Sequence, residues 1–192
     1  SKFSSALMIL ISIPLMYEMP SILAFWLKTV PPNTEVFCRA LMIAFICDQT
    51  TLGLHAANQA MGKIKVYTLA TTLPKIMLIP IMWFALKLGG SVDAAMACYI
   101  AIELLVAIFR LPYMHYSAKL NVGNYISKVI MPLIPLCIIE CIVCHFMTSI
   151  LQCPFRFLIT GIVSLMASCI AIWFFTFTKS EKNYFVKLIK RK

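Results

Sequence analysis

Six long apolar segments constrain the fold of this chain more than any other feature of its sequence. They cover residues 6–27, 36–61, 66–88, 93–113, 128–150 and 155–178. A helix needs about 20 mainly apolar residues to cross a bilayer, and a backbone in lipid must satisfy its own hydrogen bonds. The sequence therefore predicts an all-α, polytopic membrane helix bundle with six transmembrane helices over residues 1–178, followed by a tail over residues 179–192.

Composition excludes several other classes of protein. Hydrophobic residues make up 61% of the chain and charged residues 12%, whereas soluble domains have about 25% charged residues. Segments of about 10 alternating residues, the pattern of a membrane β-barrel, do not occur. No phosphate-binding glycine loop or nucleophile elbow is found either, so we do not expect an enzyme or an ATPase.

The distribution of the basic residues along the chain is better explained by its orientation in a membrane than by binding to nucleic acid. Lys and Arg number 17 against 7 Asp and Glu, a net charge of +10. Cytoplasmic loops of membrane proteins carry the excess of Lys and Arg. If both ends of the chain are cytoplasmic, Lys28, Arg39, Lys87 and Arg156 lie outside. Twelve basic residues then lie inside: Lys2, Lys63, Lys65, Arg110, Lys119, Lys128, Lys179, Lys182, Lys187, Lys190, Arg191 and Lys192. We therefore expect a multi-pass protein of the bacterial inner membrane with both termini of this segment cytoplasmic.

The tail over residues 179–192 interleaves six basic residues with Tyr184, Phe185, Leu188 and Ile189. Such a segment suits the anionic lipids of the inner leaflet. A solvated stop-transfer tail has the same composition. Both interpretations stay open for the tail.

Five ionisable residues fall inside the predicted spans: Glu18, Asp48, Lys75, Glu103 and Glu140. A charge at the bilayer centre costs at least about 2.5–3.5 kcal/mol and usually marks a pathway or a pair. At 1.5 Å per residue, each of the five is expected near the middle of its helix. Pro14 and Pro20 flank the first of them and predict a kinked helix there.

Polar residues form a stripe on the second span. Six of them fall within an arc of about 100° at 100° per residue: Asp48, Thr51, His55, Asn58, Gln59 and Gly62. The third span repeats the pattern with Thr68, Thr71, Thr72 and Lys75. The stripes could line a water-filled pathway, with Asp48 as a proton or cation site, or they could hydrogen-bond neighbouring helices.

The cysteines do not indicate a cofactor. The sequence Cys141-Ile142-Val143-Cys144-His145 matches the C-x-x-C-H pattern of haem attachment, but it lies in an apolar segment. A metal cluster there is geometrically possible, and close packing of small side chains is the simpler explanation, as it is for Gly161, Ser164 and Ser168. We therefore expect no metal and no cofactor.

Three stretches resemble a known family: IPL at 13–15, ILAFWLKTVP at 22–31 and NQAMGKIKVY at 58–67. They are similar to the C-terminal half of bacterial polysaccharide flippases, the O-antigen or capsule repeat-unit translocases. These belong to the multidrug/oligosaccharidyl-lipid/polysaccharide exporter superfamily, which includes the MATE transporters. The resemblance implies one lobe of a two-lobe transporter that moves an undecaprenyl-pyrophosphate-linked oligosaccharide by alternating access, coupled to an ion gradient. Its partners would be this lipid-linked oligosaccharide and the N-terminal lobe of the same polypeptide.

The resemblance also implies roles for the polar residues. Lys75 and Arg110 are expected to bind the pyrophosphate. Thr51, His55, Asn58, Gln59 and Thr71 are expected to bind sugar hydroxyls, and Asp48, Glu18 and Glu103 to couple ions. The family is expected to have a cationic cavity, whereas four acids and one lysine occupy these spans. Either the other lobe supplies positive charge or the acids serve ion coupling.

Three alternatives remain open at the level of sequence. A cation-coupled drug exporter of the same superfamily would also use acids within its spans. A membrane-bound acyltransferase would use His55 as a base. A structural membrane subunit would tolerate substitutions of all these residues apart from effects on stability.

Overall fold

The structure is a computed structural model that describes residues 1–62, 64–151, 153, 155–177 and 182. All regular secondary structure in this part of the chain is helical, which confirms the predicted all-α class. The helices are α1 (Lys2–Tyr17), α2 (Met19–Trp26), α3 (Thr34–Ala60), α4 (Ile64–Lys87), α5 (Val92–Ala118), α6 (Val122–Tyr125), η1 (Ile126–Ile130), α7 (Leu133–Ile150), α8 (Arg156–Ala171) and η2 (Ile172–Thr176).

The helices follow the predicted spans closely. In the described residues, five spans are long and apolar enough to cross a membrane: Thr34–Ala60, Ile64–Lys87, Val92–Ala118, Val122–Ile150 and Arg156–Thr176. The pair α1 and α2 makes a sixth if it is counted as one span. The chain is thus a multi-pass membrane protein by the length and composition of its helices.

The first predicted span is a broken helix. α1 and α2 meet at an angle of 75°, and Glu18 lies between them as the C-cap of α1 and the N-cap of α2. Pro20 follows in the first turn of α2, where its missing N–H cannot bond back across the break. Glu18 therefore lies at a break between two helices and not within one helix as predicted, at the place where the flanking prolines predicted a kink.

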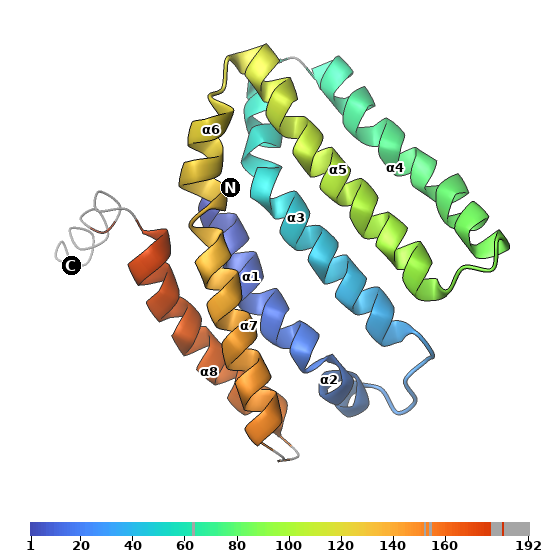
Figure 1. Cartoon of the computed structure of the whole chain (residues 1–192), viewed down its shortest axis with the longest axis vertical. Helices are drawn as coiled ribbons and strands as arrows, with labels where there is room; N and C mark the ends of the chain where they lie inside the picture. The colour runs from blue at the N-terminus through green and yellow to red at the C-terminus, as the bar shows by residue number, and fades with distance from the viewer. Residues whose placement is uncertain (63, 152, 154, 178–181, 183–192) are drawn as a thin grey trace.

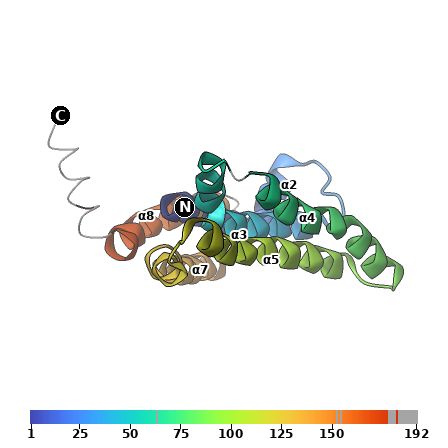
Figure 2. The same cartoon turned by 90° about the horizontal axis from the view of Figure 1, so that it is seen from above.

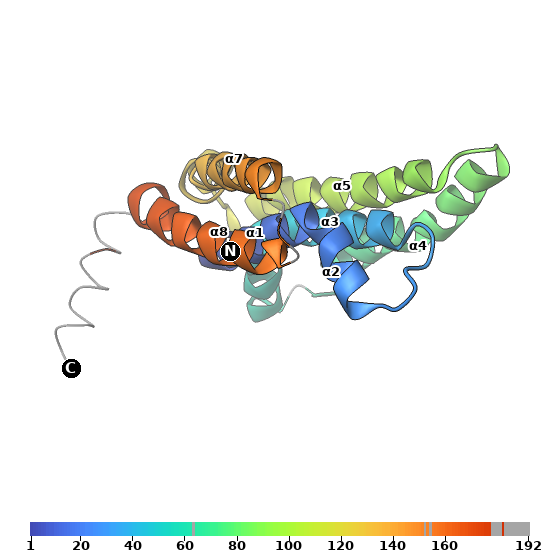
Figure 3. The ribbon, with the colours of Figure 1, turned by 90° about the horizontal axis from the view of Figure 1, so that it is seen from below.

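The long helices form an elongated layer (Figure 1), in which α1, α7 and α8 all pack against one another and α3, α5 and α4 continue from α1 in that order. Views from above (Figure 2) and from below (Figure 3) show α7 on one face of this layer and α2 projecting from the opposite face. The N-terminus, at the start of α1, and the C-terminal end of η2 both lie at the upper ends of their helices in this view (Figure 1). The predicted tail over residues 179–192 lies outside the described residues apart from Lys182.

Two hydrophobic cores lie within the layer, and α3 packs on α1 between them. One core joins α1, α7 and α8 around Ile9, Ile13 and Leu136. A smaller core joins α3 and α5 around Ala40 and Met96. The edge helix α4 packs chiefly on α5, so it leaves most of its surface uncovered by the described residues.

Candidate functional site: charged residues within the helix layer

Three of the four acids inside the predicted spans pair with a base on another helix or at its start. The pairs are Asp48 with Arg110, Glu103 with Lys75, and Glu18 with Arg156. A charge inside a membrane protein is most easily accommodated when it is paired. The fourth acid, Glu140, contacts a serine instead.

Arg110 of α5 joins this helix to α3. Its guanidinium Nη1 lies 2.7 Å from Asp48 Oδ1 and donates to Thr51 Oγ1 at 3.0 Å. The residues are 6% and 2% exposed for Arg110 and Thr51, and the Asp48 side chain is 26% exposed. The predicted coupling acid and one predicted pyrophosphate ligand thus neutralise each other between two helices.

Lys75 of α4 joins the edge helix to α5. Its Nζ lies 2.9 Å from Glu103 Oε1 and donates to Glu103 Oε2, also at 2.9 Å. The Glu103 side chain is 9% exposed, whereas the Lys75 side chain is 41% exposed. The ammonium group therefore keeps contact with the surroundings of the layer while it neutralises a buried carboxylate.

The polar stripe of the third span divides into two parts. Thr71 is buried against α5 and donates to the Tyr67 carbonyl oxygen at 3.0 Å. Thr68, Thr72 and Lys75 are all exposed and fall within about 60° of arc at 100° per residue. We call these three residues the α4 polar face.

The stripe of the second span is largely covered by other helices. Thr51 and Asn58 are buried, His55 is half-buried, and Gln59 is exposed. His55 Nε2 lies 3.0 Å from Gln59 Nε2, within hydrogen-bonding distance. The His55 ring lies 5.4 Å from the Tyr67 ring, centroid to centroid. No carboxylate among the described residues bonds His55, so an acyltransferase would have to use this base without an orienting acid.

Glu18 is the most completely paired of the acids. Arg156 donates from Nε to Glu18 Oε1 at 2.9 Å and from Nη2 to Oε2 at 3.0 Å. Thr160 adds a hydrogen bond to Oε1 at 3.0 Å. Glu18 is 1% exposed. These hydrogen bonds connect the break between α1 and α2 to the first turns of α8.

Sequence reasoning missed the hydroxyl groups of α8 as partners of the acids. Thr160, Ser164 and Ser168 recur every four residues, are 0% exposed and lie on one helix face. Thr160 bonds Glu18, and Ser168 donates to Glu140. The spacing is visible in the sequence, but it is equally typical of close packing between helices.

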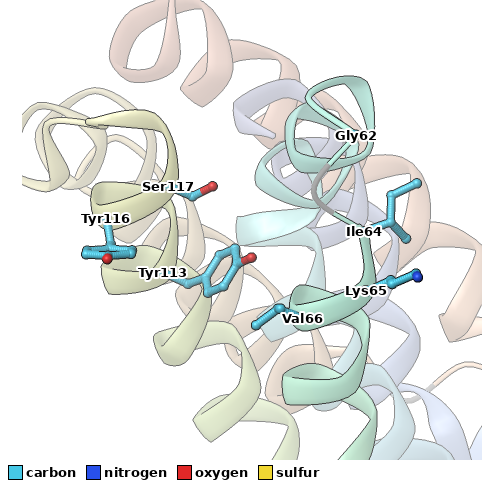
Figure 4. Close-up of a pocket in the computed structure, with 7 residues that line it drawn as sticks. All are labelled: Gly62, Ile64, Lys65, Val66, Tyr113, Tyr116 and Ser117. Carbon is cyan, nitrogen blue, oxygen red and sulfur yellow. The ribbon is translucent and has the colours of Figure 1, made fainter.

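A groove of about 700 Å³ opens between one end of α4 and one end of α5. It is lined by Gly62, Ile64, Lys65, Val66, Tyr113, Tyr116 and Ser117. Figure 4 shows Val66, Tyr113 and Ser117 directed into the gap, while Ile64 and Lys65 point away from Tyr113. None of the ion-pair residues lines this groove, so it is separate from the charged site.

The described residues include no group of three or more His, Cys, Asp or Glu side chains that could hold a metal ion. Comparisons with protein-family models, with curated proteins and with solved structures found no match. The similarity to polysaccharide flippases therefore rests on the three sequence stretches alone and stays a prediction.

Proposed function

We propose that this chain forms one lobe of an alternating-access transporter that carries an undecaprenyl-pyrophosphate-linked oligosaccharide across the bacterial inner membrane. The α4 polar face carries this proposal. It places three exposed polar side chains on a membrane-spanning helix, and the ammonium group of one of them, Lys75, is bound to Glu103 of α5.

The position of Lys75 argues against a lipid-facing surface. It is the twelfth of the 24 residues of α4, so about 17 Å of helix separates it from one end and about 18 Å from the other at 1.5 Å per residue. This separation is too great for the side chain to reach the interface easily. Lys75 is paired with Glu103, but its exposed side chain and the two neighbouring threonine hydroxyls would still face acyl chains, where polar groups without partners are costly. The α4 polar face is therefore expected to border a water-filled cavity or a second protein surface, as an incomplete transport pathway would.

The chemistry of this face suits the proposed substrate. An ammonium group donates charge-assisted hydrogen bonds to phosphate oxygens, and Thr68 and Thr72 can donate to and accept from sugar hydroxyls. Arg110 is held by Asp48 and Thr51, so it reaches a pyrophosphate only by leaving these partners. In this proposal, Lys75 exchanges Glu103 for the pyrophosphate, and Glu103 is then free to bind the coupling ion, which links ion binding to substrate binding.

Cysteine labelling in intact membranes tests whether the α4 polar face borders a water-filled cavity. Thr72→Cys places a thiol on the α4 polar face, and Met77→Cys is the matched control. Met77 is 56% exposed, five residues further along α4, and lies about 140° around the helix from Thr72 at 100° per residue. A membrane-impermeant thiol reagent should label Thr72→Cys above the background of the native cysteines, and Met77→Cys should not rise above it. Equal labelling of both positions would refute the cavity.

Transport assays test the substrate in cells that produce the complete transporter. Lys75→Gln should stop export, so that the lipid-linked oligosaccharide accumulates on the cytoplasmic side, while Lys75→Arg should restore at least part of it. Normal export by Lys75→Gln would refute the assignment of Lys75 to the pyrophosphate. If Thr72→Cys labels but Lys75→Gln exports normally, the cavity exists and serves another substrate.

A further inference from the structure

We propose that Glu140 is a proton-binding site. Its carboxyl group carries a proton in the packed conformation and exchanges it with water only when α7 and α8 separate. The site belongs to the helix group of α1, α7 and α8, apart from the α4 polar face, and the inference does not depend on the proposed substrate.

Burial without a basic partner sets Glu140 apart from the other three acids. It is 0% exposed and lies in the eighth position of the 18-residue helix α7. Among the described residues no Lys, Arg or His forms an ion pair with it. Ser168 of α8 donates to Oε1, and Oε2 has no hydrogen-bond partner in the described structure.

The titratable groups near Glu140 supply no positive charge. On α7 itself these are the thiols of Cys137, Cys141 and Cys144. His145, five residues after Glu140, is exposed and lies about 140° around the helix from it at 100° per residue. On α1, Tyr17 lies beside Cys141, and Glu18 is already bound to Arg156. On α8, besides Arg156, the exposed Cys169 is the other titratable group.

The remaining elements of this helix group offer only distant bases. Lys128 of η1 is exposed and lies twelve residues before Glu140, about 18 Å away along the helix axis. Lys2 of α1 lies over the Phe3 ring at the other end of that helix from Glu18. The η2 segment Ile172–Thr176 contains no ionisable residue.

A neutral carboxylic acid fits these surroundings and a carboxylate does not. Removing an unpaired carboxylate from water costs far more than removing the protonated group, so such a residue takes up a proton instead. The protonated group has one donor and retains acceptor capacity. The Ser168 hydroxyl can both donate and accept, so it can bond the acid in either direction.

The location makes proton exchange dependent on conformation. Glu140 and Ser168 sit on facing helices that pack along their length, and the surrounding core includes Leu136 and Cys144, both 0% exposed. Water reaches the carboxyl group only if this contact opens. Once the proton leaves, the carboxylate favours the open arrangement, because in the packed one Ser168 is its hydrogen-bond donor at Oε1 alone and Oε2 is left without a partner, whereas water can solvate both oxygens.

Infrared difference spectroscopy of the whole chain in bilayers tests directly whether Glu140 carries a proton. At neutral pH, the wild-type protein should show the carbonyl stretch of a protonated carboxylic acid, which shifts in D2O and is lost in Glu140→Gln. Ser168→Ala should fold and shift this band, because the acid loses its hydrogen-bond partner. Absence of the band, or its persistence in Glu140→Gln, would overturn the proposal.

Cys144 reports whether loss of the proton opens the helix pair. At alkaline pH, a membrane-permeant thiol reagent should modify Cys144 about tenfold faster in the wild type than in Glu140→Gln, because the glutamine cannot lose a proton and stays packed. Loss of the Glu140 charge favours the Cys144 thiolate in Glu140→Gln, so thiol ionisation alone would make the variant react faster, opposite to the expected result. Cys144→Ala gives the background from the other cysteines. Equal rates in the two proteins would refute conformation-dependent exchange at Glu140.

Discussion

Removal of the Arg110 guanidinium should be one of the most destabilising single changes among the charged residues. Arg110→Met keeps much of the side-chain volume but leaves Asp48 without its cation and Thr51 Oγ1 without a donor. Asp48→Asn removes the opposite charge and leaves the guanidinium, which is 6% exposed, without its counter-ion. The double variant removes both charges, so neither one remains buried without its partner.

The geometry sets the size of the effect. Two unit charges about 4 Å apart interact by about 4 kcal/mol at an effective dielectric constant near 20. The Asp48 side chain is 26% exposed, so we expect solvent screening to reduce this coupling to about 2 kcal/mol. Breaking a buried pair from one side costs about 3–5 kcal/mol. Arg110→Met should therefore lower the free energy of unfolding by about 3 kcal/mol and Asp48→Asn by about 2 kcal/mol, while the double variant should lose only about 3 kcal/mol.

The assay is reversible unfolding of the purified chain in mixed micelles, followed by circular dichroism as the denaturing detergent is increased. The three variants and the wild type make a double-mutant cycle that isolates the pair. Losses that add to within about 0.5 kcal/mol would show that Asp48 and Arg110 do not interact in the membrane protein, and the proposed link between α3 and α5 would be refuted.

Two further comparisons test the packing of the layer by the same assay. Arg156→Gln should lower the free energy of unfolding by about 3 kcal/mol because its partner Glu18 is 1% exposed. Arg39→Gln should lower it by less than about 1 kcal/mol because the ion pair of Arg39 with Glu35 is exposed. Equal losses in the two variants would contradict the buried network. Leu136→Ala, at 0% exposed, should cost about 2 kcal/mol, whereas Ile138→Ala, at 53% exposed, should change stability by no more than about 0.5 kcal/mol. A larger loss for Ile138 would show that another surface covers this face of α7.

The sequence predicted the helices well because hydropathy and length act locally. Apolar runs of this length must form helices in lipid, and the predicted segments differ from the observed helices mostly at their ends. The exception is the first span, where the run of apolar residues is continuous but the backbone turns by 75° at Glu18. The flanking prolines predicted a kink. The size of the bend depends on tertiary contacts at the break, such as those of Glu18 with Arg156.

The partners of the charged residues depended on tertiary structure. Periodicity fixes the direction in which Asp48, Lys75 or Glu103 leaves its own helix, but it does not say which helix lies there. The bonded residues are 28 positions apart for Lys75 and Glu103 and 138 for Glu18 and Arg156, so only the packing order of the layer brings them together. The sequence by itself thus determined which segments cross the membrane and where the charges sit along them. The fold decided that three acids are neutralised by bases and that Glu140 is left with a serine.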